Sequence, residues 1–365
     1  MRVVRRRRAA HSLPALPLAA LLVTPLLGAP ALAKSEDAST LEVAEVVLND
    51  GCRPKLLRTD KHRFIEAQIA CDAFLSYALV NEVLDGQARP EREEKLAELL
   101  EDALDRARKP FLRDGTDKID GRAIPKSVLY RGYLLLMLAG QEKVGLLSDE
   151  QRALFDALAT EVATDLDEDP LLPSFGRAIW PCDNAVAASA LTLHGRLRDD
   201  ERTLAAGDQL AGYLDSLRQS PSGFPTKVNA EGEVLEEMPR GTVLAWTAAF
   251  LAMGDRPEAK AFAGDLVEGF CSPVPLLGAG VGACREWPRG VEKEPDGVSG
   301  PIVQGFGVGA STLALAATTG AGSSSWPRRL LALAERFGIL DLRAAPQEYP
   351  LENAIFLWGR GLKRW

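Results

Sequence analysis

The chain has 365 residues and is acidic, with 51 Asp and Glu against 43 Lys and Arg and a formal net charge of −8. After residue 33 the chain has no basic stripe, and an acidic chain of this kind repels nucleic acid and anionic lipid, so we exclude both as partners. The length exceeds the usual size of one domain, although closed helical barrels reach it as a single unit.

Residues 1–33 have the pattern of a cleaved secretory signal peptide. Five arginines between residues 2 and 8 precede an apolar run from Leu13 to Leu27, and Ala31-Leu32-Ala33 forms a small-residue cleavage site. Cleavage leaves 38 basic against 51 acidic side chains, a net charge of −13. We therefore expect an exported protein, periplasmic or extracellular, that has no membrane contact after cleavage.

After an N-terminal segment (34–59) with one short helix expected at Leu41–Asn49, the domain from 60 to 365 alternates two kinds of helix. Apolar helices, which must be buried on most sides, are expected at Phe64–Leu84, Tyr130–Leu138, Ala185–Leu193, Thr242–Met253, Val303–Ala317 and Glu352–Arg364. Amphipathic helices that face water are expected at Pro90–Lys109, Asp149–Asp167, Asp199–Arg218, Pro257–Phe270 and Trp326–Phe337.

The apolar helices start about 50 to 65 residues apart, which is typical of a helical-hairpin repeat. A period of this length with one wholly buried helix per repeat predicts an all-α fold, an (α/α)6 toroid of inner and outer helices. The Gly, Ala and Ser residues of the apolar helices favour close approach of their axes.

Two stretches interrupt the helices. The alternation in Phe224–Leu235 around Asn229-Ala-Glu-Gly predicts a β-hairpin, and Cys271–Ile302 is a long loop rich in Gly and Pro. Long ordered loops are often binding loops or lids. Both stretches precede inner helices, so we expect both at the mouth, the rim formed by the N-terminal ends of the inner helices.

All five cysteines lie after residue 33, and an odd number leaves at least one thiol unpaired. Cys271 and Cys284 bracket a short loop and are the first expected pair. Cys52 with Cys71 is the second, which leaves Cys182 free beside Asp183.

Parallel inner helices bring polar and aromatic residues together at the mouth, where the helix dipoles favour anionic or strongly hydrogen-bonding ligands. Asp183, either a helix cap or a pocket residue, and Glu286, between Arg285 and Trp287, are the expected catalytic carboxyls; Glu237 is a further candidate. The expected substrate-binding residues are Tyr130, Arg131, Trp180, Cys182, Asn184, Arg240, Arg285, Trp287, Asp296 and Gln304.

Several of these residues also have a purely structural interpretation. Arg131 and Arg240 stand at inner-helix starts, where each could equally pair with a buried carboxylate or with a substrate anion. Asp296 could simply shape a turn, and Cys182 is more easily a buried inert thiol than a nucleophile. The histidines His62 and His194 lack metal-ligand spacing, so we expect no zinc and no other cofactor.

The alternating hairpins and the Trp180-Pro-Cys-Asp-Asn184 segment resemble the six-hairpin α/α-toroid superfamily of glycosidases, polysaccharide lyases and sugar epimerases. They are also similar to the linalool dehydratase/isomerase-type domain. The first resemblance implies carboxylates at the mouth, which correspond here to Asp183 and to Glu286 or Glu237. The second implies acid–base residues together with a cysteine, and of these only the cysteine has a counterpart here, Cys182.

Three functions follow. The first is an exported enzyme that acts on a small-molecule or glycan substrate, with Asp183 and Glu286 as acid and base and with Trp180, Trp287 and Tyr130 as ring-stacking walls. The second is a hydro-lyase or isomerase of small alcohols that depends on Cys182. The third is a binding protein without catalysis, expected if the protein's own side chains fill the cavity.

Overall fold

The computed structural model describes residues 39–55, 64–218, 223–278, 280–296, 299–336 and 346–365. The expected signal peptide, residues 1–33, lies outside the described residues, as does His62. Residues from Asp37 onward form a single unit. In the described part of the chain, no helix combines the length and apolarity that crossing a membrane requires.

Six inner helices form a closed ring. Each packs against the next in chain order, and the last packs against the first. They are α2 (Ala67–Leu84), α4 (Val128–Lys143), α6 (Pro181–Arg198), α8 (Gly241–Met253), α10 (Val308–Gly320) and α12 (Pro350–Arg360). The toroid predicted from the repeat is therefore confirmed.

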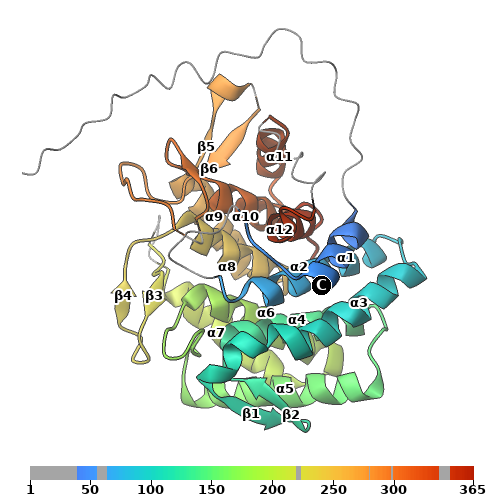
Figure 1. Cartoon of the computed structure of the whole chain (residues 1–365). Helices are drawn as coiled ribbons and strands as arrows, with labels where there is room; N and C mark the ends of the chain where they lie inside the picture. The colour runs from blue at the N-terminus through green and yellow to red at the C-terminus, as the bar shows by residue number, and fades with distance from the viewer. Residues whose placement is uncertain (1–38, 56–63, 219–222, 279, 297–298, 337–345) are drawn as a thin grey trace, which may run out of the picture. The chain divides into compact units, whose positions relative to one another are not determined.

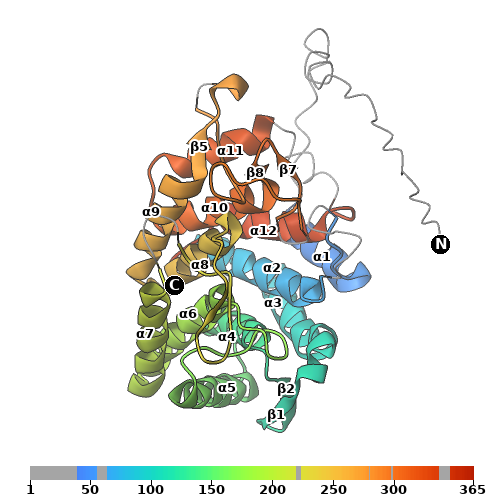
Figure 2. The ribbon, with the colours of Figure 1, turned by 90° about the vertical axis from the view of Figure 1, so that its left-hand side faces the viewer.

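The outer helices surround this ring, as Figure 2 shows. They are α1 (Thr40–Asp50), α3 (Pro90–Asp102), α5 (Asp149–Glu168), α7 (Glu201–Ser216), α9 (Glu258–Phe270) and α11 (Trp326–Arg336). Among the described residues no outer helix follows α12; instead α1 packs against α12, α2 and α3 and completes the sixth hairpin. α1 therefore packs with the helices of the ring, whereas residue 60, the expected start of the toroid domain, lies outside the described residues.

Side-chain composition explains which helices lie inside. Every residue of α8 except Trp246 is buried, whereas α3 buries only Leu96, Leu99 and Leu100. Local capping fixes several helix starts, because the Ser127 hydroxyl accepts from the Tyr130 backbone at α4 and Asp200 caps α7. A π-helical turn (Ala103–Ala107) and a 3-10 helix (Lys109–Asp114) follow α3.

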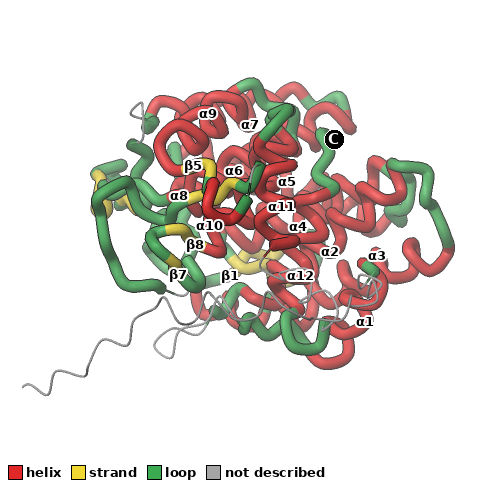
Figure 3. The backbone as a smooth tube through the Cα atoms, turned by 90° about the horizontal axis from the view of Figure 1, so that it is seen from above, coloured by secondary structure: helices red, strands yellow, loops and turns green. Residues whose placement is uncertain are grey.

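The strands are short two-stranded antiparallel hairpins, visible in Figure 3 as yellow segments among the helices. The pairs are β1 (Thr116–Ile119) with β2 (Arg122–Pro125), β3 (Lys227–Val228) with β4 (Val234–Glu236), β5 (Cys271–Pro273) with β6 (Gly282–Cys284), and β7 (Ile302–Val303) with β8 (Phe306–Gly307). A 3-10 turn (Pro275–Leu277) lies between β5 and β6. Each hairpin lies in a link from an outer helix to the next inner helix, on the side of the mouth. The hairpin expected at 224–235 is confirmed as β3–β4; the other three were not foreseen.

Both expected disulfides are present, and the fifth thiol is free. Cys271 pairs with Cys284 across β5 and β6, and Cys52 pairs with Cys71 of α2. Cys182 is the buried free cysteine. The bridge from Cys52 ties the chain after α1 to the ring.

Aromatic side chains fill the centre of the ring. The Phe74 ring of α2 contacts the rings of Tyr77, Tyr133, Trp246, Phe250 and Trp358, with centroid distances of 4.7 to 6.3 Å. At the end away from the mouth, the Trp365 backbone donates to Met253 O at 2.8 Å and its indole donates to Asn81 Oδ1 at 2.8 Å. The ring is therefore a packed core along much of its axis.

Two glycines of α7 provide a test of this packing. A Cβ atom on Gly207 would lie 2.8 Å from the Thr192 backbone nitrogen of α6, whereas a Cβ on Gly212 would meet nothing within 4 Å. We expect Gly207→Ala to lower the free energy of unfolding by about 1 to 3 kcal/mol because α6 and α7 must separate. Gly212→Ala should raise it by about 0.5 to 1 kcal/mol through helix propensity. Urea denaturation of both variants checks this, and equal effects would contradict the close packing.

Candidate active site

Inner helices that alternate with outer ones all run in the same direction, so their N-terminal turns share the mouth. Polar groups there are close to free backbone N–H groups and to the positive ends of the helix dipoles. They are also buried by the hairpins and loops that precede each helix. Burial raises the pKa of a carboxyl group, whereas the helix dipole lowers it. The balance of the two sets the pH at which the group ionises.

Asp183 lies in the first turn of α6, where Trp180 is the N-cap and Pro181 the first helical residue. Its side chain is almost fully buried and receives hydrogen bonds from the Ser174 hydroxyl and from the Cys182 thiol, whose sulfur is 3.8 Å from Asp183 Oδ1. Burial raises the pKa of Asp183 to about 7, although both hydrogen bonds act in the opposite direction. The carboxyl group therefore titrates near neutrality.

Glu66 is the second carboxyl group of this kind and was missed in the sequence. It is the N-cap residue of α2, yet its side chain makes no capping hydrogen bond. Burial and, to a smaller extent, the charge of Asp183 raise its pKa to about 7. Because the charge of Asp183 acts on the pKa of Glu66, the two carboxyl groups lie in the same region of the mouth. One weak signal in the sequence could have found Glu66, because an acidic residue lies directly before an apolar helix.

Tyr133 of α4 lies beside both carboxyl groups. Burial raises the pKa of its phenol above the usual value, and the charges of Tyr77, Asp183, Glu66 and Cys182 add to the effect. The hydroxyl group therefore remains a neutral donor at any ordinary pH. Glu66, Tyr133, Cys182 and Asp183 thus come from three different inner helices and form one acidic cluster.

Arg240 and Glu286 form a separate buried ion pair at the start of α8. Arg240 Nε lies 2.5 Å from Glu286 Oε1, to which the Thr242 hydroxyl also donates at 2.8 Å. Arg240 in addition binds Asp296 at 2.8 Å, and its guanidinium lies 4.7 Å from the centre of the Trp287 ring. These contacts tie the loop after β6 to α8.

Glu286 therefore does not fit the predicted role of acid–base partner to Asp183. Its side chain is 0% exposed and its charge is compensated by Arg240. Burial raises its pKa, but the Arg240 charge and the hydrogen bonds from Arg240 and Thr242 oppose this effect. Of the two interpretations of Arg240, the structure favours the buried carboxylate partner over a substrate anion.

Three predicted substrate-binding residues have structural roles instead. The Tyr130 hydroxyl donates to Ala103 O at 2.8 Å, inside the core. Arg131 is fully buried and binds Asp117, Asp165 and the Pro125 carbonyl, so its guanidinium faces α5 and the β1–β2 hairpin. Asn184 exchanges hydrogen bonds with the Leu172 backbone and fastens the loop before α6. The sequence could not reveal these partners because they are distant in the chain.

The remaining predicted residues lie around the mouth. Glu237 and Gln304 are exposed, and Gln304 has a left-handed backbone with φ of 52° in the β7–β8 turn. Trp180 and Arg285 are half-buried, and the Arg285 guanidinium lies 4.7 Å from the Phe306 ring centre. Trp287 is buried between Arg240 and Lys293. Asp296 also shapes its turn by accepting from the Ser299 backbone at 2.8 Å.

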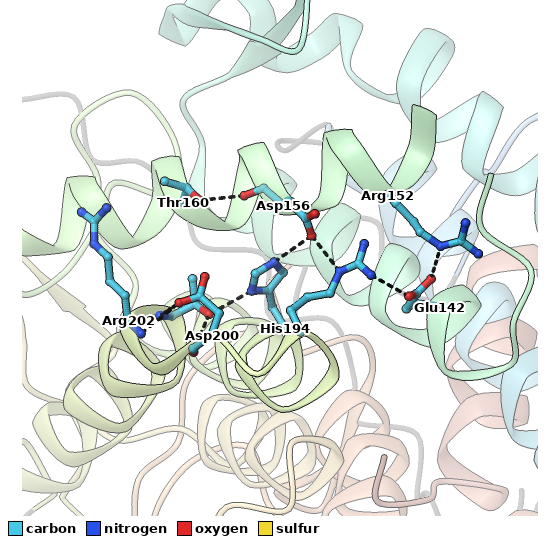
Figure 4. A network of polar contacts seen from close by, with 9 residues as sticks. Glu142, Arg152, Asp156, Thr160, His194, Asp200 and Arg202 are labelled. Carbon is cyan, nitrogen blue, oxygen red and sulfur yellow. Dashed lines mark hydrogen bonds and ion pairs between the residues drawn. The ribbon is translucent and has the colours of Figure 1, made fainter. Parts of the chain in front are cut away.

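Cys182 and His194 do not have the environments of catalytic groups. Burial and the neighbouring Asp183 charge raise the pKa of the Cys182 thiol, which stays protonated. His194 lies near the other end of α6, where its ring contacts Asp156 of α5 at 3.2 Å and Thr203 of α7 at 2.9 Å (Figure 4). It joins outer helices to the ring, and burial lowers its pKa.

Among the described residues, no group of three His, Cys, Asp or Glu side chains has the arrangement of a metal site.

No protein-family model and no curated protein matches the sequence. Solved structures do match. An unsaturated glucuronyl hydrolase from Bacillus sp. superposes with a TM-score of 0.57 at 14% identity, covering 88% of this chain and 94% of the hydrolase. The chain has the six-hairpin (α/α)6 toroid fold.

Two further toroids show the same likeness. An alpha-amylase from Clostridium perfringens gives a TM-score of 0.55 at 9% identity and covers 92% of this chain and 100% of its own. An alpha-1,6-mannanase from Salegentibacter sp. gives 0.51 at 12% identity, covering 89% of this chain and 99% of its own. The structural similarity establishes the toroid fold of this chain. At identities this low it does not establish the roles of the residues at the mouth, which follow from their own geometry.

The raised pKa of Asp183 predicts a pH-dependent stability. The folded state retains a proton that the unfolded chain releases above about pH 4, so the free energy of unfolding falls as pH rises toward 7. Asp183→Asn removes the titrating group and, with it, this fall in the free energy of unfolding. We expect the variant to gain about 2 to 4 kcal/mol relative to the native protein between pH 4 and pH 8.

Urea denaturation of both proteins across this range measures the effect. Glu237→Gln, an exposed carboxyl on the same side of the toroid, is the matched control and should leave the pH profile unchanged. A profile for Asp183→Asn parallel to that of the native protein would contradict a buried, protonated Asp183.

Proposed function

We propose that the protein is an exported enzyme that cleaves a glycosidic bond by general acid–base catalysis with Asp183 and Glu66. The observation that carries the proposal is the pair of carboxyl groups at the mouth, Asp183 buried and Glu66 half-buried, both with a pKa of about 7. General acids and bases work best when their pKa lies near the working pH. The toroid fold shared with glycoside-cleaving enzymes supports a carbohydrate substrate.

The surroundings of the two groups suggest their roles. Asp183 receives hydrogen bonds from Ser174 and Cys182, which stabilise its ionised form, and it is the first to lose a proton. The resulting charge makes Glu66 retain its proton longer. Glu66 then protonates the departing glycosidic oxygen, while ionised Asp183 accepts a proton from the water that attacks the sugar carbon.

Export is part of the same proposal. The basic, apolar and small-residue segments of residues 1–33 have the order of a secretory signal. Disulfides persist mainly in oxidising compartments, and the chain has two of them, Cys52–Cys71 and Cys271–Cys284. Both features support a periplasmic or extracellular location for an enzyme that acts on glycans outside the cytoplasm.

Of the other two functions, the one that depends on Cys182 is disfavoured because a buried, protonated thiol is a weak nucleophile. The binding protein without catalysis is only partly supported. Aromatic rings do fill the axis of the ring up to Trp246, but the mouth above them retains Asp183 and Glu66.

Substitution of the two carboxyls tests the proposal. We expect Asp183→Asn and Glu66→Gln each to lower turnover at least about 100-fold on any glycan that the native protein cleaves. Unsaturated glucuronyl oligosaccharides, alpha-1,6-mannotriose and starch form a suitable first panel, because structural neighbours act on or bind such glycans. The pH profile of the native enzyme should peak near 7, where one group is ionised and the other protonated.

Glu286→Gln and Glu237→Gln are comparison variants in the same assay. Glu237→Gln should retain turnover because this side chain is exposed. Glu286→Gln should lower the melting temperature by weakening the Arg240 pair while the pH optimum stays in place. Full activity of Asp183→Asn would refute the assignment.

Alkylation distinguishes the thiol-dependent function. We expect iodoacetamide to leave the folded protein unmodified and active at pH 8, because the Cys182 thiol is buried and protonated. After unfolding in urea without reductant, mass spectrometry should find one modified thiol. Rapid inactivation of the folded protein would instead favour the hydro-lyase or isomerase.

A further inference from the structure

A further buried carboxyl group, Asp72 of α2, belongs neither to the acidic cluster of the mouth nor to an ion pair. Its side chain is 0% exposed. Gln68 Nε2 donates to Asp72 Oδ1 at 3.0 Å, whereas Asp72 Oδ2 accepts from no donor among the described residues. A buried carboxylate needs a cation or several donors to replace its lost hydration. These surroundings therefore suit a neutral carboxylic acid.

Asp102 of α3 is the group to which a neutral Asp72 can donate. The Gln68 amide nitrogen joins the two carboxyls, because it also donates to Asp102 Oδ2 at 2.9 Å. The carboxyl groups of Asp72 and Asp102 are in hydrogen-bonding contact with each other. Arg106 Nε lies 2.9 Å from Asp102 Oδ1. A proton shared by two carboxyls stays on the one without a cation, so Asp72 is the donor and Asp102 the acceptor.

The same cluster fastens α1 to the ring. Arg106, in the π-helical turn after α3, donates to Val47 O at 2.8 Å and to Leu48 O at 3.2 Å, in the last turns of α1. The backbone N–H of Cys52, just after α1, donates to Gln68 Oε1 at 2.8 Å. Since α1 takes the place of the sixth outer helix beside α2 and α12 (Figure 1), the cluster holds the helix that completes the toroid.

Charged and titratable groups face Asp72 from three elements. They are Asp102 of α3, Arg106 of the π-helical turn and Tyr130 of α4, whose phenol responds to the charge of Asp72. Burial raises the pKa of Asp72 well above its usual value, Asp102 adds to this effect, and Arg106 opposes it least of all the neighbours. α1 presents the backbone carbonyls bound by Arg106, and on α12 the carboxyl of Glu352 accepts from a backbone N–H.

We propose that Asp72 and Asp102 share one proton and that this proton is a latch that fastens α1 to α2 and α3. While Asp72 holds the proton it donates to Asp102, and the pair carries one negative charge, which Arg106 balances. When Asp72 releases the proton to water, two adjacent carboxylates repel each other and the buried one must be hydrated. The cluster then opens, and α1 leaves the seam between α12 and α2.

The pH dependence of this opening is the first test. Opening releases one proton, because a hydrated Asp72 ionises above about pH 4. The opening equilibrium of α1 therefore rises about tenfold per pH unit, until Asp72 ionises inside the folded protein. Hydrogen exchange of the amides of α1 (Thr40–Asp50), corrected for the intrinsic exchange rate at each pH, measures this equilibrium.

Asp72→Asn isolates the proton. The Asn side chain keeps both contacts, since its oxygen accepts from Gln68 and its NH2 group donates to Asp102, but it has no proton to release. We expect its α1 amides to be as protected as in the native protein at pH 5 and to stay so as the pH rises. Equal pH slopes for the native protein and Asp72→Asn, or a level native profile, would overturn the latch.

Asp105→Asn is the matched control for loss of a negative charge. This exposed carboxyl lies three residues after Asp102 and pairs with Lys109, which is exposed too. Because its charge is hydrated both before and after opening, the variant should keep the native pH slope for α1. A level α1 profile in Asp105→Asn would assign the slope to general charge and would equally overturn the latch.

Reduction of the two disulfides in the native protein is the second test and needs no variant that folds. Cys71 directly precedes Asp72, and its partner Cys52 follows α1, so opening exposes this bridge. Cys271–Cys284, in the β5–β6 hairpin, is the internal reference. With a phosphine reductant, we expect the rate of the first relative to the second to rise with pH as α1 exchange does.

A rate ratio that is constant with pH would overturn the latch whether or not Asp72→Asn folds. Neither readout involves turnover, so the latch and the catalytic proposal fail separately. If Asp183→Asn and Glu66→Gln retain turnover while α1 exchange follows Asp72, the acid–base assignment fails and the latch stands. If both variants lose turnover while Asp72→Asn keeps the native pH slope, the reverse holds.

Discussion

Burial of the inner helices on all sides is the constraint on which the rest of the structure depends. A helix that is apolar all round is stable in water only when other helices cover every face, and six such helices achieve this by closing a ring. Close approach requires small residues; a Cβ on Gly132 of α4, for example, would lie 3.1 Å from the Ala187 backbone nitrogen of α6. Closure also requires α1, which covers the seam between α12 and α2.

The same closure creates the chemistry of the mouth. A carboxylate in the first turn of a helix is normally stabilised by the helix dipole, which lowers its pKa. At Asp183 and Glu66, desolvation by the surrounding loops outweighs this stabilisation and raises the pKa to about 7. At Glu286, by contrast, Arg240 compensates the buried charge. Of these three acids at one end of the ring, Glu286 thus differs from the other two because a cation is its partner.

The aromatic core limits what the mouth can bind. Packed rings occupy the axis below Trp246, and Trp365 occupies the opposite end. Side chains therefore fill the ring along its axis and at the end where Trp365 lies.

Sequence alone determined the class of fold, the number of inner helices and both disulfides, because helical periodicity, composition and cysteine spacing are local properties. It did not determine which residues share the mouth with Asp183. Tyr130 and Arg131 looked equivalent to Tyr133 in the sequence, yet only Tyr133 lies beside the carboxyls. Side-chain direction on a buried helix changes by about 100° per residue, so neighbours in sequence face different partners. Those partners, like Arg240 for Glu286 across 46 residues, are assigned only when the ring closes.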